Sequence, residues 1–367
     1  MYLFNPEHDL ALANFSPNYT PPAAVSLMAA ELPLLPVWYS GGEPVVAEGE
    51  QQRLYLEAVQ QLLPITSSLV SYSEVSLQTN QTIIPWGWDP VLRKRLLSYG
   101  VHEERLPSPE ELQMLRDYSH RQHAVRILGE LQAEEAAFCG ESRYFTSLED
   151  LLGGKGLIRV MGAITDKQID WCRRVIRGQG GVVAEPVLRK VEDFAMEFYL
   201  KDGNTSFASY SLFRASTSGA YLGNELLSDA LILEKLSRYI PIRLLEDLRV
   251  SLTAKLAASF PRYNGYAGVD MMICETEDGY RIQPCVEINM RMNMGMVARI
   301  FYNRFMAADG MGTFTVDYFK NPGDALAFHQ KMQQESPLKV QQGRIISGYL
   351  ALTPIIEATR FAAYVIV

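Results

Sequence analysis

Three polar side chains alternate with apolar residues in the segment Pro284–Met296. Glu287, Asn289 and Arg291 are spaced two residues apart, so in a β-strand all three side chains would lie on one face. Carboxylate and amide oxygens are ligands that Mg²⁺ prefers, and an arginine can bind phosphate oxygens through two parallel hydrogen bonds. The spacing therefore suits a magnesium ion that carries a phosphate group.

The residues before this segment form a second apolar run that would pair with it. Tyr266–Cys274 and Tyr280–Ile288 are strand-like, and a two-residue turn at Asp278-Gly279 would join them as a hairpin. Asp270 then lies opposite Glu287. Facing carboxylates repel each other unless a cation lies between them. Acidic pairs also occur on strands where water screens them, but both acids here lie within apolar runs, which favours a bound metal.

The composition is that of a soluble globular protein. The chain has 367 residues, 48% of them hydrophobic and 21% charged, which is enough for two or three subdomains with their own cores. A net charge of −8 argues against a general nucleic-acid binder. No apolar run reaches about 18 residues, and the N-terminus lacks the basic region of a signal peptide. The four cysteines form no CxxC pair, so we expect a cytoplasmic protein, bound to neither nucleic acid nor membrane.

The hairpin also supports a family resemblance. Gly-Val-Asp on its first strand and Glu-x-Asn-x-Arg on its second resemble the metal-binding end of the ATP-grasp superfamily, which includes D-alanine–D-alanine ligase and glutathione synthetase. The likeness covers about Leu106–Arg304. It implies a site for ATP and Mg²⁺, or Mn²⁺, in which Asp270, Glu287 and Asn289 hold the metal. Arg291 would contact phosphate or the acyl-phosphate intermediate.

The resemblance implies an α/β fold with α+β lobes. A small parallel α/β domain at residues 1–105 would precede two lobes that clasp a nucleotide cleft, at 106–190 and 191–330, and residues 331–367 would add strands to the core. In the first lobe, Gly153, Gly154 and Lys155 would form a phosphate lid. Only Leu151 and Leu152 precede these glycines, so the strand that normally leads into the lid is short. Arg121 is a weaker candidate for a phosphate contact, with a solvated surface as its alternative.

An apolar run that breaks at a Glu-Pro pair resembles the hinge between the two lobes. Within Val182–Leu188, Glu185 would lie near the amino group of adenine. Pro186 has no N–H group, so Val187 or Leu188 would donate the backbone hydrogen bond. Asp193, near the start of the next strand, would bind the ribose hydroxyls. Glu185 could instead protect an edge strand from pairing with another chain.

The N-terminal region alternates apolar runs with helical patterns. A helix is expected over Glu48–Leu63 with Leu54, Ala58 and Leu62 on its apolar face, and the runs predict parallel strands whose polar endings share one edge. The three runs are Tyr2–Phe4, Leu34–Tyr39 and Ile83-Ile84.

One polar cluster follows the first of these runs. Asn5, Glu7 and His8, with Asp9, could contact a substrate that carries an amine or a carboxylate. Alternatively, Asn5 or Asp9 caps the following helical turn and His8 lies on the surface.

The C-terminal half is expected to complete the second lobe. Phe194–Leu200 and Phe207–Phe213 read as antiparallel strands, and Leu231–Leu256 as helices broken near Pro241. Two further strands are expected at Gly343–Leu352 and Arg360–Val367. Arg214 and Asn224 would face substrate or phosphate in the ATP-grasp arrangement.

These features favour an ATP-dependent ligase that joins a carboxylate to an amine. ATP would phosphorylate the carboxylate, and the amine would attack the acyl phosphate. The expected partners are small-molecule carboxylate and amine substrates, with a homodimer as one option for assembly. The alternative is a catalytically degenerate ATP-grasp-fold protein that binds nucleotide or a small metabolite without turnover. A metal site without a nucleotide ranks third.

Overall fold

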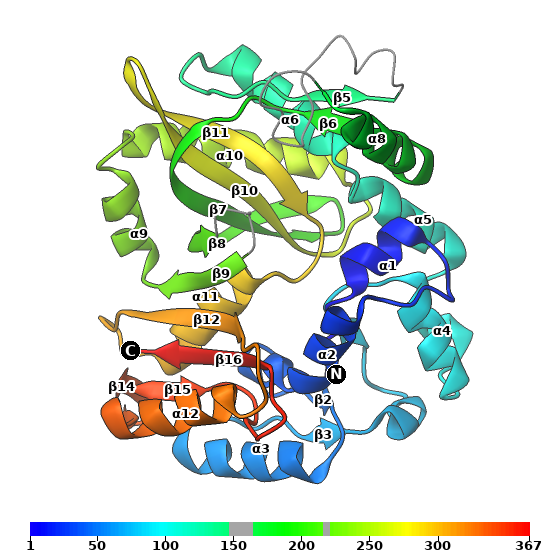
Figure 1. The fold of residues 1–367 in the computed structure, drawn as a ribbon, viewed down its shortest axis with the longest axis vertical. Coiled ribbons are helices and arrows are strands. Elements are labelled where there is room, and N and C mark those ends of the chain that lie inside the picture. Colours follow the sequence, from blue (N-terminus) through cyan, green and yellow to red (C-terminus); the bar gives the residue numbers. More distant parts are fainter. Residues whose placement is uncertain (147–163, 216–220) are drawn as a thin grey trace. The chain divides into compact units, whose positions relative to one another are not determined.

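The computed structural model describes residues 1–146, 164–215 and 221–367 (Figure 1). These residues form two compact units. Unit 1 contains residues 1–114, 211–231 and 292–367, and unit 2 contains residues 115–210 and 232–291. The domain boundaries expected near residues 105, 190 and 330 remain a prediction. No helix in the described part of the chain is long and apolar enough to cross a membrane.

The N-terminal part of unit 1 is a small parallel sheet with helices, which confirms the expected α/β class. Its four strands are all parallel in the order β3-β2-β1-β4. They are β1 (Tyr2–Leu3), β2 (Val45–Val46), β3 (Leu69–Val70) and β4 (Ile84–Pro85). The accompanying helices are α1 (His8–Asn14), α2 (Ala23–Glu31), α3 (Glu50–Leu62) and α4 (Pro90–Ser98), with short 3-10 turns η1 (Leu35–Trp38), η2 (Tyr72–Leu77) and η3 (Glu103–Arg105).

Two predictions for this region were wrong. The run Leu34–Tyr39 is not a strand, because Pro36 cannot donate to a ladder and the segment forms η1 instead. Trp38 is fully buried there, and its indole N–H donates to the Leu352 carbonyl at 2.6 Å. Helix α3 was predicted with the wrong face inward: Leu56 is buried, whereas Leu54 is 51% exposed. Val59 continues the buried face, and Leu62 and Ala58 are exposed with Leu54.

The rest of unit 1 is built on antiparallel strands. β9 (Tyr221–Leu226), β12 (Gly312–Tyr318), β16 (Phe361–Ile366) and β15 (Tyr349–Ala351) pair in that order, and the last residues of β8 (Asn204–Ala215) pair with β9. The expected strand Arg360–Val367 is confirmed as β16. The expected strand Gly343–Leu352 was wrong as a single strand, because the chain breaks at Gly348, which has a φ of 105°, and forms two strands in different sheets. The unit also contains helices α11 (Met294–Phe305) and α12 (Asp324–Glu335) and the hairpin of β13 (Lys339–Gln341) with β14 (Arg344–Ser347).

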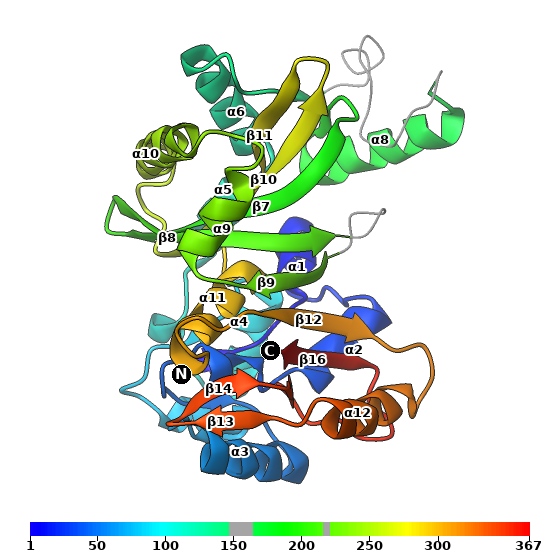
Figure 2. The ribbon, with the colours of Figure 1, turned by 90° about the vertical axis from the view of Figure 1, so that its left-hand side faces the viewer.

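Unit 2 is organised around four antiparallel strands in the order β11-β10-β7-β8 (Figure 2). They include β7 (Arg189–Lys201), β10 (Gly265–Thr276) and β11 (Gly279–Asn289). Alternate residues of β7, such as Phe194 and Phe198, are fully buried on one face. Helix α6 (Gln122–Glu134) packs on β11 and helix α10 (Ile242–Ser259) on β7. The opposite face carries the polar residues of the candidate site.

The remaining elements complete the chain. A small sheet pairs β5 (Arg143–Phe145) with β6 (Val182–Ala184), and helix α8 (Asp166–Gln179) packs beside it. Helices α5 (Pro109–Tyr118) and α9 (Asp229–Leu236) each contain residues of both units. Helix α10 begins directly after Pro241, so the expected helix break there is confirmed.

Candidate functional site

The hairpin of β10 and β11 brings two carboxylates face to face. Asp270 pairs directly with Glu287, as predicted. The predicted turn was wrong by one residue: Thr276 pairs with Gly279, so the turn is Glu277-Asp278. The register then shifts between Asp270 and Met272, which restores the predicted pairing.

The register shift has a physical cause in β11. Met272 pairs with Gln283, so β11 contributes extra residues between Gln283 and Glu287. Pro284 lies in this stretch, and a proline cannot donate to the strand ladder. The backbone N–H of Cys285 is instead satisfied by the Gln283 side chain at 3.2 Å. The bulge therefore sets the position of Glu287 relative to β10.

Strand β7 adds further polar residues to the same face. Cross-strand partners share a face of a sheet, and Asp193 pairs with Met272 while Glu197 pairs with Gly268. Gly268 in turn pairs with Asn289. Glu197 is only 2% exposed, and sequence reasoning missed it. The available signal was its position in β7, where it alternates with buried apolar residues.

A chain of hydrogen bonds joins three of the predicted site residues. Arg291 donates from Nη2 to Asn289 Oδ1 at 3.1 Å, and Asn289 donates from Nδ2 to Asp270 Oδ2 at 3.0 Å. Burial, followed by the negative charge of Glu287, raises the pKa of Asp270 to about 7. The predicted group Asp270, Glu287, Asn289 and Arg291 is thus brought together.

Glu287 has a second charged partner, which lies on another element. Arg121, at the N-terminus of α6, is 3.0 Å from Glu287 between Nη2 and Oε2. Both side chains are about two-fifths exposed, 43% and 40%, so water screens this ion pair. Arg121 therefore balances the charge of Glu287 at little energetic gain, and it can be displaced.

The oxygen atoms at this face fit a magnesium ion. In the described ranges, no three His, Cys, Asp or Glu side chains form a metal-binding group. Mg²⁺ is usually held by one or two carboxylates, with water and substrate phosphates as its other ligands. Asp270 and Glu287 supply two carboxylates, and Asn289 supplies an amide oxygen once Arg291 releases it. The raised pKa of Asp270 marks a carboxylate that a cation would stabilise.

A small cavity lies along the same strands. Its volume is about 170 Å³, below the ~300 Å³ at which pockets for drug-sized ligands begin, so it suits one ring system. Its lining residues are Gly140, Glu185, Pro186, Leu188, Lys190, Met272 and Gln283.

The cavity contains part of the predicted adenine site. Glu185 and Leu188 line it, whereas Val187 does not and is 71% exposed. Glu185 accepts a hydrogen bond from the Ser142 hydroxyl at 2.5 Å. Asp193 is paired with Lys190, with Nζ and Oδ2 2.5 Å apart. Sequence reasoning missed Lys190, a cation at the cavity wall.

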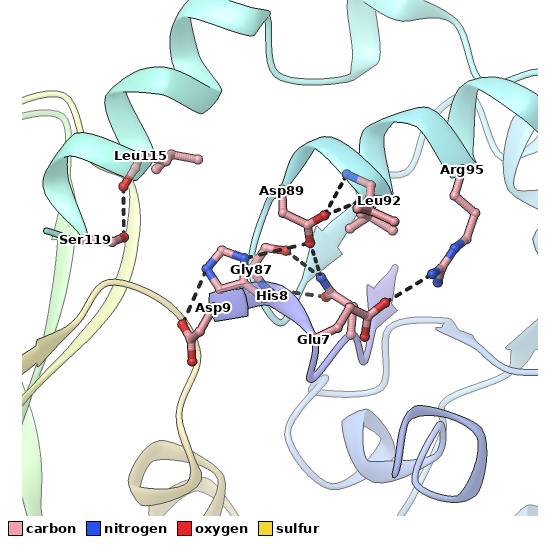
Figure 3. A network of polar contacts seen from close by, with 11 residues as sticks. Glu7, His8, Asp9, Gly87, Asp89, Leu92, Arg95, Leu115 and Ser119 are labelled. Atoms are coloured by element: carbon pink, nitrogen blue, oxygen red, sulfur yellow. Dashed lines mark hydrogen bonds and ion pairs between the residues drawn. The ribbon is translucent and has the colours of Figure 1, made fainter. Parts of the chain in front are cut away.

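The predicted substrate residues of unit 1 form a separate buried network (Figure 3). Asn5 is fully buried, and its Nδ2 donates to the Gly87 carbonyl at 2.8 Å and to Asp89 Oδ2 at 3.0 Å. His8 is 3% exposed, so the alternative that it lies on the surface is wrong. Its Nδ1 is 4.0 Å from Asp89 Oδ2. Glu7 is paired with Arg95 at 3.1 Å.

Asp89 holds this network to helix α4. Its Oδ1 accepts hydrogen bonds from the backbone N–H groups of Val91 and Leu92 at 2.8 and 2.9 Å, the arrangement of a helix N-cap. Burial raises the pKa of Asp89 to about 6, and the nearby Glu7 contributes in the same direction. The suggested capping role for Asn5 or Asp9 was wrong: helix α1 begins at His8, and no side chain of the described residues caps it.

The other predicted residues are placed as follows. Asn224 is 1% exposed, donates to the Ser211 hydroxyl at 2.6 Å and accepts from Tyr221, so its amide holds strands of unit 1 together. Arg214 is exposed and pairs with Gly223 in the β8–β9 ladder. The lid residues Gly153, Gly154 and Lys155 lie outside the described residues.

Comparisons with known proteins give structural neighbours only. A scan against protein-family models and a search of curated proteins both find no match. The chain is similar to a biotin carboxylase–ATP complex from Campylobacter jejuni, at 12% identity and a TM-score of 0.49 over 100% of this chain and 86% of that one. It is also similar to N5-carboxyaminoimidazole synthetase from Staphylococcus aureus in complex with ADP, at 11% identity and a TM-score of 0.46 over 88% of this chain and 92% of that one. An L-amino acid ligase from Bacillus licheniformis is similar at 13% identity and a TM-score of 0.42, over 88% of this chain and 93% of that one. At these levels of similarity, function has to be inferred from the residues of the site.

Proposed function

We propose that this protein is an ATP-grasp ligase that joins a carboxylate to an amine through an acyl phosphate. One observation carries the proposal: Asp270 and Glu287 face each other across β10 and β11, and Asn289 links Asp270 to Arg291. Two opposed carboxylates, an amide and a guanidinium are what a magnesium–phosphate site requires. Mg²⁺ or Mn²⁺ is the proposed metal, and a cytoplasmic homodimer is the proposed setting.

Each residue has a proposed task in the reaction. Asp270, Glu287 and Asn289 would hold the ion, which when bound neutralises charge on the transferred phosphate. Arg291 would leave Asn289 and bind phosphate oxygens. Because there is little covalent work for a protein in phosphoryl transfer, positioning and charge neutralisation supply most of the rate.

The nucleotide would extend along the same sheet face. Glu185 and Leu188, which line the small cavity described above, would contact the adenine ring, and Asp193 would contact the ribose. Lys190, which pairs with Asp193, would exchange that carboxylate for a phosphate oxygen when the nucleotide binds. Lys155, with Gly153 and Gly154, is proposed to cover the phosphates.

A second candidate is a protein that binds a nucleotide or metabolite without turnover. It is favoured by the pairing of Glu287 with Arg121 and of Asn289 with Arg291, since these contacts satisfy the site without a metal. A ligase releases ADP only when both substrates are present, whereas a binding protein releases none. Measuring ADP release therefore separates the two.

The direct test is calorimetric titration of Mg-ATP into the wild type and Glu287→Gln. We expect micromolar binding that weakens at least tenfold in the variant, or about 1.4 kcal/mol. Glu275→Gln is the matched control, because Glu275 lies on the same hairpin and pairs with Arg189 instead. Equal binding by wild type and Glu287→Gln, or no binding by the wild type, would overturn the proposal.

A further inference from the structure

Unit 1 contains a cavity of about 340 Å³ at one edge of its parallel sheet. Phe4 follows β1 directly, Ala47 and Glu48 follow β2, and Tyr72 follows β3. These residues all lie at carboxyl ends of parallel strands, where ligands bind in α/β sheets. The volume is within the range of small-molecule sites, whose lower limit is roughly 300 Å³. We call this space the Glu7 cavity.

The charged wall of the Glu7 cavity is built from buried contacts. Glu7 lines the cavity although its side chain is only 4% exposed. Arg95 donates to Glu7 Oε1 at 3.1 Å and to the Tyr72 hydroxyl at 3.4 Å. The other carboxylate oxygen, Glu7 Oε2, is buried and accepts no hydrogen bond from the residues that the structure describes. A buried acceptor without a donor costs about 1–3 kcal/mol, and a donor that enters the cavity would remove that cost.

The remaining lining favours a cation over an anion. Glu48 also lines the cavity and accepts a hydrogen bond from the Tyr72 backbone N–H at 2.6 Å. Two carboxylates, Glu7 and Glu48, therefore face one guanidinium, Arg95, which Glu7 and Tyr72 already engage. The cavity has spare acceptors and an excess of negative charge, so an anionic ligand would be repelled.

The rest of the wall is apolar and made of small side chains. Phe4, Val46 and Ala47 form one part of the wall, and Ala29 and Ala30 of α2 form another. Every residue of α2 is at least partly exposed, although the helix is rich in apolar residues. Small side chains on α2 thus leave room for a short apolar body beside the charged wall.

We propose that the Glu7 cavity binds a primary ammonium group attached to a short apolar body. The inference rests on the proposed function in one respect: the ligand would be the amine that the ligase consumes. The proposal also gives different roles to Asn5, Glu7 and His8, the three residues of this region that were predicted to contact a substrate. Glu7 would contact the ammonium, whereas Asn5 and His8 hold the surrounding loops through Gly87 and Asp89.

The test uses probes with one carbon skeleton: n-butylammonium, 1-butanol and butyrate, titrated without nucleotide by ligand-observed NMR. We expect n-butylammonium to bind at least tenfold more tightly than the other two. The Glu7→Gln variant should bind n-butylammonium at least tenfold more weakly than the wild type does. Glu57→Gln is the control, because Glu57 is an exposed acid of α3 paired with Arg53 and does not line the cavity; it should bind like the wild type.

A second variant keeps the test decisive if Glu7→Gln fails to fold. Ala29→Leu fills the cavity from a partly exposed helix position and leaves Glu7 intact; it should also abolish n-butylammonium binding. Butyrate binding as tightly as n-butylammonium, or unchanged binding in both variants, would overturn the inference. If Mg-ATP binds and the ammonium probe does not, only this inference fails. If the probe binds and Mg-ATP does not, the site stands and the ligase assignment fails.

Discussion

Each unit contains an aspartate whose pKa is raised, but Asp89 of unit 1 is fully buried and Asp270 of unit 2 is half-buried, and the two have different partners. In unit 1, Asp89 accepts three hydrogen bonds from its own chain, two from the backbone of α4 and one from Asn5. In unit 2, Asp270 accepts one hydrogen bond from the residues that the structure describes, and Asn289 donates it. Burial is the largest cause of the raised pKa at each, about 6 for Asp89 and about 7 for Asp270.

This difference in hydrogen-bond donors indicates a structural role for Asp89 and a ligand-binding role for Asp270. The hydrogen-bonding capacity of Asp89 is used to cap a helix and to tie two loops together, which stabilises unit 1. Asp270 faces a second carboxylate, Glu287, and lacks comparable donors. An acid that is buried without enough partners destabilises the fold unless a cation compensates. Counting the donors at each buried acid thus distinguishes the two roles.

The largest effect on stability is expected from Asp89→Ala. The change removes the α4 cap and leaves the Asn5 amide and two backbone N–H groups without their acceptor. Losing a cap costs about 0.5–2 kcal/mol and each buried unpaired group about 1–3 kcal/mol. We expect a loss of about 2–4 kcal/mol at pH 5, measured by urea unfolding with the tryptophans of unit 1 as the fluorescence probe. A loss below about 1 kcal/mol would remove the structural role of Asp89.

The pH dependence of stability gives a second test. The pKa of Asp89 is about 6 in the folded protein, above its ordinary value of 3.8. Its contribution to stability is therefore fully present below pH 3.8 and is lost as pH rises through 6. Between pH 5 and pH 8 the free energy of unfolding of the wild type should fall by about 1.4 kcal/mol relative to that of Asp89→Ala. A difference between the two that does not change with pH would contradict this.

A close contact beside Asp89 predicts an effect of similar size. A β-carbon on Gly87 would lie 2.5 Å from ring atoms of His8, which is 3% exposed and cannot move freely. Gly87→Ala should therefore cost about 1–3 kcal/mol by overpacking. Gly129→Ala is the matched control, since no atom of the described residues lies within 4 Å of the added β-carbon. In helix α6 that change should stabilise by up to about 1 kcal/mol. Thermal unfolding of both variants measures the contrast.

The smallest effect is expected at the exposed partner of Glu287. Because the Arg121–Glu287 ion pair is exposed, Arg121→Leu should lower stability by less than about 1 kcal/mol. Mg-ATP affinity should change far less than in Glu287→Gln, because Arg121 only balances the acid. Calorimetric titration measures both affinities. A loss as large as that of Glu287→Gln would instead make Arg121 a phosphate ligand.

The parts of the site that lie close in sequence could be predicted from it. Asp270 and Glu287 belong to two apolar runs joined by a short polar turn, so the hairpin pattern was enough to predict that the two residues face each other. The exact turn was missed because Pro284 shifts the register, and a compensating bulge cannot be read from alternation. In unit 1, Pro36 turned an apolar run into a 3-10 turn, and the two-residue strand β2 is too short to show a period.

Residues that meet only through the fold could not be predicted. Arg95 reaches Glu7 across 88 positions of the chain, and Asp89 reaches Asn5 across 84. Lys190 and Glu197 lie on a strand whose site-facing side is fixed by its pairing with β10. Such partners have no spacing signature, because loops of any composition can bring them together.

The most direct test of the central claim is the thermal stability of Asp270→Asn and wild type at pH 8, with and without Mg-ATP. Removing a half-buried charge that faces Glu287 should make the ligand-free variant more stable than the wild type. Mg-ATP should then raise the unfolding temperature of the wild type but leave that of Asp270→Asn unchanged. A variant that is less stable than the wild type and still gains stability from Mg-ATP would show that Asp270 serves the fold and not the ligand.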